Sequence, residues 1–332
     1  MSFQKTHFIM NKDIKYFGID ISYLVFDVTD SDGHYYQFKN TLPGFKKFVK
    51  LLDSQSHCVM EATGYYHYQL AYYLLENGIN VSVENPLSVK RFIQMRLSKI
   101  KTDKSDSKLI CAYAKQVSLK LWQGASKQTQ ECLQITRVLS VYVKQRTMLK
   151  NKIHGEAILG SPSKAVVSSL KRSLKQLLKE IKTLEEKLLI LVKASHQDLF
   201  TRLKTIPGIG RKTAIMLIVL TGGFERFSSA SELCSYAGLT PIIRQSASSV
   251  KGRPRISKMG NQKLRNLLFM CSFTACKYNK ACRDLYERIV AKGKSKKLAL
   301  IAVCNKLLKQ AFEISKSGLI FDGAYKSTLV KN

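Results

Sequence analysis

The chain has 332 residues, 45% of them hydrophobic, which is enough for two or three globular domains with proper cores. Lysine and arginine number 55 against 23 acids, so the net charge of +32 implies a polyanionic partner, nucleic acid before an anionic membrane surface. The longest apolar run, at 214–220, is far too short for a membrane span and no signal pattern is visible, so we expect a cytoplasmic protein.

The positive charge is concentrated after residue 110. Residues 1–110 carry 14 basic and 11 acidic side chains, whereas the remainder carries 41 basic and 12 acidic ones. We therefore expect the later part of the chain to provide the electrostatic attraction. Eight cysteines are scattered without paired CxxC spacing, which favours reduced, mostly buried thiols over a zinc site.

Short β-rich runs open the chain. Three of them, the last two joined by a turn at 31–33, predict a three-stranded antiparallel meander at 16–20, 24–30 and 34–40. The pattern then predicts helix, strand, helix and strand at 44–53, 57–61, 65–78 and 80–85. Strands followed by alternating helices and strands indicate an α/β domain with a mixed sheet, which we assign to residues 1–125.

The lysine-rich stretch KIKTDKSDSKLIC, residues 99–111, keeps two aspartates three positions apart. Thr102 is a suitable N-cap, and the apolar residues that follow predict a helix that begins there. Asp103 and Asp106 then share one face of this helix. For this stretch alone, the simpler explanation is that acids favour the first helical turn, where free N–H groups carry partial positive charge.

Two further acids end predicted strands. Asp20 ends the first strand in GID, and Glu61 ends a later strand in VMEATGYY. Together with Asp103 and Asp106 they could converge on one metal site, which neither pair indicates alone. Hard divalent cations such as Mg²⁺ require several oxygen ligands, and phosphates can supply the rest.

Helical patterns replace strand patterns across residues 126–200. Apolar residues recur there at alternating steps of three and four, at Val167, Leu170, Leu174, Leu177, Ile181, Leu184, Leu188 and Leu191. This heptad stripe predicts a coiled coil, either as an oligomerising arm or as a hairpin within one chain. A buried helix in a bundle is the alternative, because one stripe does not identify its partner.

The segment 203–220 places the glycine turn PGIG between two helical patterns. This spacing resembles a helix-hairpin-helix, in which Gly208 and Gly210 present backbone N–H groups to a phosphate. Arg211 and Lys212 add positive charge at the start of the following helix. A plain helix C-cap and turn is the alternative.

A basic, serine-rich stretch, SASSVKGRPRISKMG at 246–260, lies in the mainly α C-terminal domain that we assign to residues 201–332. Its cations are Lys251, Arg253, Arg255 and Lys258. By composition alone, a flexible loop that binds phosphates is the favoured interpretation.

The motifs GID, EATGYY and KTDKSD, followed by PGIG, YAGLTP and SASSVKGRPRISKMG, resemble the IS-one-ten family of insertion-sequence transposases, related to the Piv and MooV DNA invertases. The resemblance covers nearly the whole chain. It implies an N-terminal RuvC-like, RNase H-type fold. The family's DEDD acidic tetrad, which binds Mg²⁺ or Mn²⁺ beside the scissile phosphate, maps onto Asp20, Glu61, Asp103 and Asp106.

The same resemblance places the family's nucleophilic serine at Ser246, the first serine after YAGLTPIIRQ. Attack by its hydroxyl on a phosphodiester would conserve bond energy in a phosphoserine, so that strands can be rejoined without ATP. The chain departs from the family pattern at Tyr23, where a lysine is frequent, and at Ser107, where alanine is common. Neither departure removes an acid.

The partners that the resemblance implies are DNA at the element ends and target, a structured noncoding guide (bridge) RNA, and further copies of the chain. The active form would be a homo-oligomer, a dimer or a tetramer, associated with the bacterial nucleoid. We therefore predict a transposase or site-specific recombinase that uses both the acidic tetrad and Ser246.

Two other hypotheses remain open at this point. A Holliday-junction-type nuclease would use the tetrad to hydrolyse DNA with water. The serine-rich stretch would then only bind phosphate. A non-enzymatic architectural binder would make the four spaced acids coincidental in a chain with a net charge of +32. A covalent protein–DNA adduct, trapped by denaturation, separates the recombinase from the nuclease.

Overall fold

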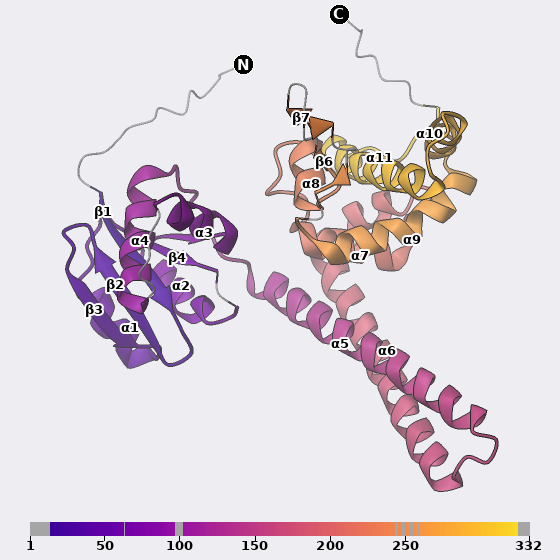
Figure 1. Ribbon diagram of the computed structural model, residues 1–332, viewed down its shortest axis with the longest axis horizontal. Helices are drawn as coiled ribbons and strands as arrows, with labels where there is room; N and C mark the ends of the chain where they lie inside the picture. The colour runs from indigo at the N-terminus through magenta and orange to yellow at the C-terminus, as the bar shows by residue number, and fades with distance from the viewer. Residues whose placement is uncertain are drawn as a thin grey trace, which may run out of the picture. The chain divides into compact units, whose positions relative to one another are not determined.

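The computed structural model describes residues 14–62, 64–96, 102–242, 245–246, 250–251, 255–257 and 259–324. The chain divides into two compact units, Met1–Ala125 and Ser126–Asn332, which are taken here one at a time (Figure 1). None of the helices in these described ranges is both long and apolar enough to cross a membrane.

A five-stranded mixed sheet forms the first unit, in the order β3-β2-β1-β4-β5 (Figure 1). The strands are β1 (Lys15–Ile21), β2 (Val25–Asp30), β3 (Tyr35–Lys39), β4 (Ser56–Glu61) and β5 (Asn80–Glu84). The first three strands pair antiparallel, and β4 and β5 run parallel to β1. The predicted meander and mixed sheet are confirmed.

Helices cover both faces of this sheet. On one face, alternate residues of β1 and β4 pack against α1 (Leu42–Val49) and α2 (His67–Glu76). On the other face, Val59 of β4 packs against α3 (Pro86–Met95) and α4 (Asp103–Gln116). Since side chains alternate along a strand, Asp20 and Glu61 belong to the face that α4 covers.

Helix α3 is an element that the sequence prediction missed. The side chain of Asn85 caps it by accepting a hydrogen bond from the backbone N–H of Leu87 at 2.9 Å, and Pro86 occupies the first helical position. Proline is tolerated there because its missing N–H would have no helical partner. The Asn-Pro pair after a strand was therefore the available signal.

A long helical hairpin opens the second unit. It consists of α5 (Lys127–Ile158) and α6 (Lys164–Leu203), and its two helices pack against each other within one chain (Figure 1). All eight residues of the heptad stripe are buried or half-buried in α6. Near the base, Gln128 donates a hydrogen bond to the carbonyl of Leu191 at 2.7 Å. The stripe therefore marks the seam of an intramolecular hairpin, and the oligomerising arm stays a prediction.

The remaining helices of this unit share one core with the base of the hairpin. They are α7 (Arg211–Thr221), α8 (Ala230–Tyr236), α9 (Gln262–Tyr278), α10 (Lys280–Ala291) and α11 (Lys296–Ser317). Leu188 and Val192 of α6 are buried in the same hydrophobic cluster as Leu217 of α7 and Leu307 of α11. All eight cysteines of the chain are free thiols, and seven of them are buried.

The serine-rich stretch contains short strands where the sequence predicted a loop. Strand β6 (Pro241–Ile242) pairs antiparallel with β9 (Arg255–Ile256), and β7 (Gln245–Ser246) pairs antiparallel with β8 (Val250–Lys251). Within the described residues, these are two separate two-stranded sheets, and β6 lies just before the serine-rich stretch.

Candidate active site

Two acids occupy the carboxyl ends of neighbouring parallel strands. The β1–β4 register pairs Ile19 with Met60, so Asp20 and Glu61 are the next residues along their strands. Ile19 and Met60 are buried in the core of the opposite face. Strand alternation therefore directs both carboxylates toward α4.

The first turn of α4 brings two more acids to this edge. Thr102 caps the helix: its hydroxyl accepts a hydrogen bond from the N–H of Ser105 at 3.1 Å, and its own N–H donates to the Ser105 hydroxyl at 2.8 Å. This reciprocal capping box fixes where the helix begins. Asp103 and Asp106 are consequently one turn apart on the same face, as the sequence predicted.

Gly18 explains how α4 can approach the sheet so closely. A β-carbon at this position would lie only 2.2 Å from the backbone nitrogen of Cys111 and 2.4 Å from the carbonyl oxygen of Ser107. The backbone of α4 therefore rests directly on β1. A buried hydrogen bond of 2.8 Å between the hydroxyls of Thr29 and Ser107 fixes the contact, so Ser107 has a structural role here.

The electrostatics of Asp20 indicate that the four acids share one region. Burial raises the pKa of Asp20, and the negative charges of Asp106, Asp103 and Glu61 raise it further, to about 6. A cluster of carboxylates that repel one another is the donor set that a hard divalent cation requires. The residues present therefore fit a divalent-metal site. We call Asp20, Glu61, Asp103 and Asp106 the acidic tetrad.

Two supporting acids escaped the sequence analysis. Asp27 and Glu84 are the cross-strand partners of Asp20 and Glu61, respectively. Asp27 is 2% exposed, and it accepts hydrogen bonds from the hydroxyl of Tyr35 and, at 3.0 Å, from the amide of Gln37. Both hydrogen bonds go to one oxygen of the Asp27 carboxylate, Oδ1, and they hold this side chain in place beside Asp20. The pairing of strands in the predicted meander, which places Asp27 opposite Asp20, was the signal that could have identified Asp27.

Glu84 is occupied in a similar way by α4. It accepts a hydrogen bond from the Tyr113 hydroxyl at 3.0 Å. Burial and this hydrogen bond to Glu84 raise the pKa of Tyr113 to about 12, so the phenol remains a donor. The contact ties the end of β5 to α4 and supports the position of that helix beside Glu61.

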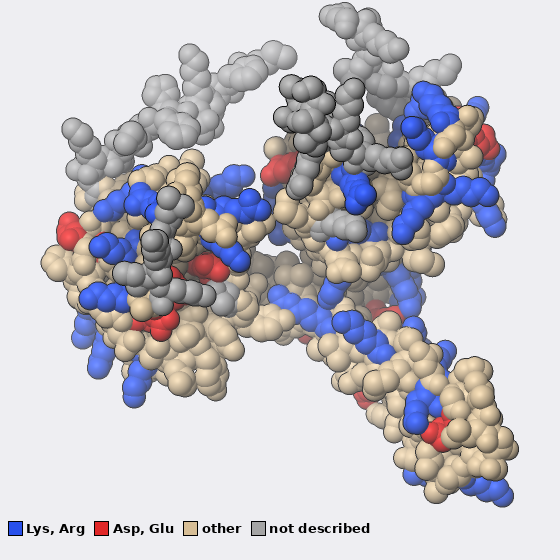
Figure 2. All heavy atoms as spheres, in the orientation of Figure 1, with Lys and Arg blue, Asp and Glu red and all other residues tan. Residues whose placement is uncertain are grey.

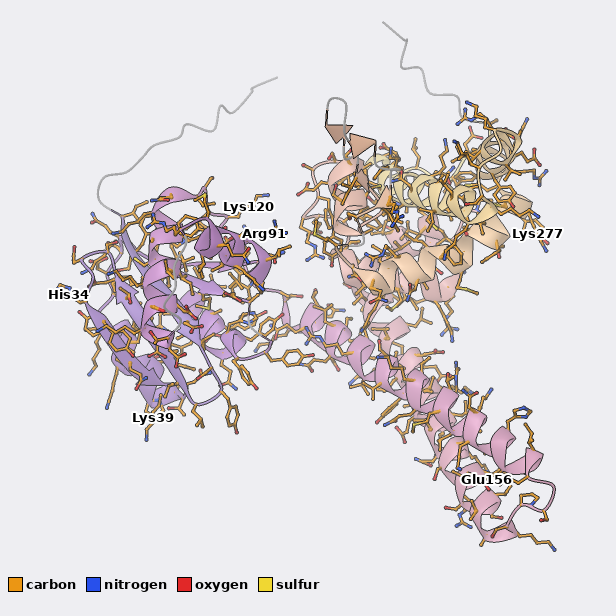
Figure 3. All side chains as sticks on the ribbon, viewed as in Figure 1. His34, Lys39, Arg91, Lys120, Glu156 and Lys277 are labelled. Atoms are coloured by element: carbon orange, nitrogen blue, oxygen red, sulfur yellow. The ribbon has the colours of Figure 1, made fainter. Side chains whose placement is uncertain are left out.

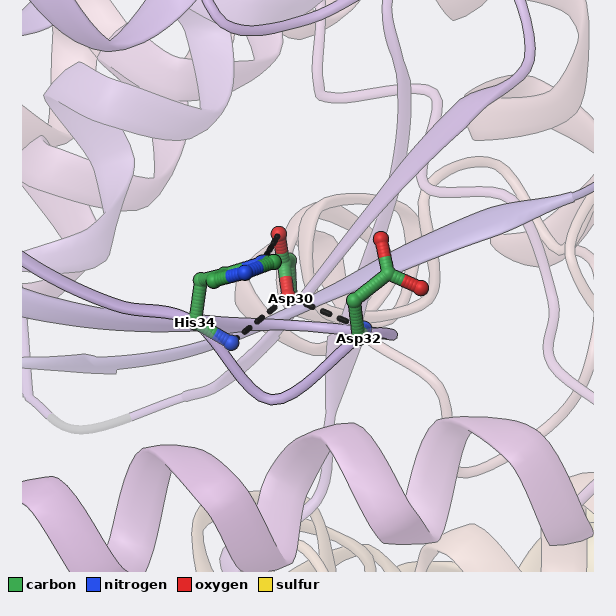
Figure 4. Close-up of side chains that lie close together, drawn as sticks. All are labelled: Asp30, Asp32 and His34. Carbon is green, nitrogen blue, oxygen red and sulfur yellow. Dashed lines mark hydrogen bonds and ion pairs between the residues drawn. The ribbon is translucent and has the colours of Figure 1, made fainter.

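A separate acidic group lies at the β2–β3 turn (Figure 4). Within the described part of the chain, Asp30, Asp32 and His34 form the only group of three metal-ligating residues whose ligand atoms all lie within 4.8 Å of one another. No three residues of the acidic tetrad, which lies wholly within the described residues, bring their ligand atoms this close together. One carboxylate oxygen of Asp30 accepts hydrogen bonds from the backbone N–H groups of Asp32 and His34, both at 2.9 Å. Asp30 also forms an ion pair of 3.5 Å with Lys15. Together these interactions indicate that Asp30 stabilises the β2–β3 turn.

The predicted nucleophile lies in a partly described segment. The backbone of Ser246 belongs to β7 and that of Lys251 to β8, but their side chains lie outside the described residues. Arg253 and Lys258 lie outside them altogether, whereas Arg255 is exposed in β9. The role of Ser246 stays a prediction.

The PGIG turn lies between α6 and α7, as predicted. Gly208 has a φ of +106°, and a β-carbon there would come within 2.8 Å of Ala275 on α9, so this glycine serves the turn and its packing. Gly210 precedes α7 with open space around it. Lys212 forms an ion pair of 2.7 Å with Glu185 of α6. Phosphate binding by Gly208, Gly210, Arg211 and Lys212 stays a prediction.

A basic cleft of about 1430 Å³ opens beside the β6–β9 pair of the second unit. Residues of β6 and β9 line one side of it, and α8, α10 and α11 line the others. Five cations line it against one acid, Asp284; they are Arg255, Arg288, Lys297, Lys306 and Lys309. Of these cations, only Arg255 was predicted from the sequence, because the others are spread over α10 and α11.

Positive side chains are distributed over both units and along the hairpin. Figure 2 shows lysines and arginines far outnumbering acids on the visible face. Arg91 and Lys120 project from the first unit, and Lys277 projects from α9 in the second (Figure 3). A surface of this kind favours binding to nucleic-acid backbones.

Two family patterns match the chain. Residues 200–287 match the family described as "Transposase IS116/IS110/IS902 family", and residues 17–159 match a DEDD transposase pattern of the IS110 type. Pilin gene-inverting proteins of Moraxella lacunata and Moraxella bovis are each 30% identical over 92% of this chain and 97% of their own length. A transposase for the insertion sequence IS1111A of Coxiella burnetii is 26% identical over 89% of this chain and 88% of its own.

Proposed function

Because this chain belongs to the IS116/IS110/IS902 family of transposases, it is a DNA transposase or recombinase, and we propose that it cuts and rejoins strands through a serine nucleophile together with a divalent-metal site. The observation that supports the proposal is that the strand-end carboxylate of Asp20 experiences the negative charges of Glu61, at the neighbouring strand end, and of Asp103 and Asp106, on one helical turn. The sheet order and the helices on both faces support an RNase H-like assignment for the first unit.

The acidic tetrad would hold the metal. A bound Mg²⁺ or Mn²⁺ would supply Lewis-acid polarisation of the scissile phosphate. Asp20 and Glu61 are fixed by the sheet, whereas Asp103 and Asp106 are fixed by the capped turn of α4 and its contact at Gly18. Because rigid elements position all four, the site is preorganised to orient a phosphate.

Ser246 would carry the covalent step. Its hydroxyl oxygen would form a bond to phosphorus while one bond from phosphorus to a sugar oxygen breaks, and the freed sugar oxygen takes up a proton. The energy of the broken ester stays in the phosphoserine, so attack by a second sugar hydroxyl can rejoin strands and release the serine. The cations near β9, such as Arg255, would offset the charge that develops on the phosphoryl oxygens.

DNA binding follows from the family, and two further partners are part of the proposal. The basic cleft and the net charge of +32 suit a phosphodiester backbone of either DNA or RNA, so a structured guide RNA is compatible with them. We also propose a homo-oligomer in the active complex. The exposed apolar side chains of the hairpin, including Val141 and Met148, support this part of the proposal.

The Ser246→Ala variant should bind DNA and RNA with unchanged affinity but form no covalent adduct. Removal of a nucleophile typically reduces turnover by several orders of magnitude, because no other group takes over the bond-forming step. Denaturing electrophoresis would detect the adduct in the unaltered chain. Mass spectrometry after nuclease trimming would then locate the modified residue.

The matched control for this experiment is Ser257→Ala, which removes a serine hydroxyl from the same basic stretch. The Ser257 hydroxyl donates to the carbonyl of Met259 at 3.3 Å, so its loss should cost little, and the adduct should persist. A nucleotide found on Ser257, or efficient recombination by Ser246→Ala, would contradict the assignment of the nucleophile.

A junction nuclease that uses water is the second candidate. It is favoured by one observation: all four tetrad residues lie in the first unit, whereas Ser246 lies in the second. In that case, DNA would be cut but not rejoined, and Ser246→Ala would cut at the normal rate. The adduct experiment therefore separates the two candidates.

Charges placed on the hairpin seam test the oligomeric part of the proposal. Leu177→Glu and Leu184→Glu each put a carboxylate where a half-buried leucine faces α5, so the free energy of unfolding should fall by about 1–3 kcal/mol. If the hairpin also mediates assembly, the mass measured by light scattering should fall as well. Lys179→Glu, at an exposed position of the same helix, is the control. Lower stability with an unchanged mass would contradict a role of this seam in assembly.

A further inference from the structure

Four large apolar side chains are exposed in the two loops that follow β1 and β4 of the first unit. Tyr23 is 71% exposed, Leu24 70%, Tyr65 63% and Tyr66 44%. Single exposed apolar residues are common on protein surfaces, whereas contiguous aromatic groups mark binding sites. We call these four residues the aromatic shelf.

The shelf is a built structure. Tyr23 lies in the β1–β2 turn and Tyr66 in the segment between β4 and α2, and their ring centroids are 5.9 Å apart. Asn40 joins the two segments, because its side-chain amide donates to the carbonyls of Ser22 at 2.8 Å and of Tyr66 at 3.4 Å. The Ser22 hydroxyl, in turn, donates to the carbonyl of Val25 at 2.8 Å. The rings are therefore presented to solvent by a braced pair of loops.

The position of the shelf connects it with the acidic tetrad. Tyr23 follows Asp20 by three residues, and Tyr65 follows Glu61 by four, so both loops leave the strand ends that carry the acids. Lys39, which ends β3 opposite Val25, projects from the sheet unit at the same strand ends (Figure 3). The acids, the shelf and this cation therefore lie at the same end of the sheet.

The chemistry of the shelf favours a nucleobase over a protein partner. Four side chains are far fewer than the roughly 20–30 residues that each partner contributes to a stable protein interface. Exposed aromatic rings in a positively charged protein are, by contrast, the usual platform on which unpaired bases stack. In a duplex the faces of the bases are hidden by their neighbours, so such a platform selects unpaired nucleotides.

We propose that the aromatic shelf stacks on an unpaired base of the strand whose phosphate lies at the acidic tetrad. This inference rests on the proposed function for the location of the phosphate, and it adds the class of substrate. The strand must be unpaired beside the phosphate, so the duplex is opened before that strand enters the site. Tyr23 and Tyr66 are then specificity-determining residues for single-stranded DNA.

The test compares the binding of single-stranded and duplex DNA by the full chain. The probe is an oligonucleotide that contains 2-aminopurine, whose fluorescence falls when the base stacks. The double variant Tyr23→Ala, Tyr66→Ala should bind the single strand roughly tenfold or more weakly, since each stacked base contributes about 1–3 kcal/mol. Its affinity for duplex DNA should be unchanged, and the fluorescence quenching should be lost.

Two matched variants make the result specific. Tyr23→Phe, Tyr66→Phe keeps both rings, so it should bind the single strand within about twofold of the unaltered chain, since a phenyl ring stacks as a phenol does. Tyr278→Ala removes a tyrosine that is also 71% exposed, but on α9 of the second unit, and it should have no effect. Circular dichroism checks that each variant is folded.

Three outcomes would overturn the proposal: no loss of single-strand affinity in the alanine variant, an equal loss for duplex DNA, or an equal loss in the phenylalanine variant. The last would assign the effect to the hydroxyl groups and not to stacking. The adduct assay separates this inference from the proposed function. A chain that stacks the probe but never forms an adduct would refute the serine mechanism and leave the shelf standing, and the reverse result would refute the shelf alone.

Discussion

Neutralising any member of the acidic tetrad should reduce DNA strand cleavage and rejoining by at least about a hundredfold, because charge stabilisation by a bound metal is worth several kcal/mol in the transition state. The changes are Asp20→Asn, Glu61→Gln, Asp103→Asn and Asp106→Asn. Each is nearly isosteric, but it removes the negative charge that a hard cation requires. A recombination assay with supercoiled DNA in Mg²⁺ measures the effect.

The stability of the Asp20 variant provides a second readout. The pKa of Asp20 is raised to about 6 in the folded protein, so its carboxylate costs stability once the pH rises from its ordinary pKa of 3.8 through about 6. Above pH 6, Asp20→Asn should therefore keep or raise the melting temperature, whereas loss of an acid that stabilises the fold would lower it. The variant should still bind DNA.

Asp198→Asn is the matched control for the tetrad. It neutralises an exposed aspartate on α6, in the second unit, and it should leave recombination and DNA binding unchanged. Full activity in Mg²⁺ of two tetrad variants would refute the metal site. A melting temperature lowered in all four variants would identify the acids as structural.

Gly18→Ala should both destabilise the first unit and abolish activity. The added methyl group would lie 2.2 Å from the backbone nitrogen of Cys111, and a backbone neighbour cannot turn aside as a side chain can. Overpacking of this kind typically costs about 1–3 kcal/mol, because α4 must move away from β1. That movement would also carry Asp103 and Asp106 away from Asp20. Chemical denaturation and the recombination assay measure the two effects.

Gly155→Ala is the control, and it should raise stability where Gly18→Ala lowers it. Gly155 lies inside α5 with no atom within 4 Å of the added β-carbon, so alanine should stabilise the helix by up to about 1 kcal/mol. Its recombination activity should be normal. If Gly18→Ala kept both stability and activity, the close contact between α4 and β1 would not be what positions the tetrad.

Local patterns were sufficient for most of the first unit. Short β-rich runs predict β1 to β3, and the Thr102 cap with the apolar residues that follow it predicts α4, because these signals depend only on neighbours in the chain. Helix α3 was missed although Asn85 and Pro86 mark its start. The strands within the serine-rich stretch were missed because two-residue strands have no periodicity to detect.

The heptad stripe shows which feature of the fold a local pattern cannot predict. It correctly predicted the side of α6 that is buried, since burial follows the helical period. It left open whether the partner is α5, another helix of the bundle or another chain. The structure pairs α6 with α5 in the same chain, which depends on the turn between the helices and on contacts near their base, such as Gln128 with Leu191.

The sequence by itself determined which residues are available for chemistry: acids at two strand ends, two acids in one capped turn, and a charge of +32 that implies a polyanionic partner. Only the tertiary structure decided that the acids share one region, because this depends on the order of β1 and β4 in the sheet and on the contact of α4 with Gly18. The positions of Asp27, of Glu84 and of the aromatic shelf likewise depend on the tertiary structure. Each joins residues from separate strands or loops, and no local spacing in a chain encodes contacts that only folding creates.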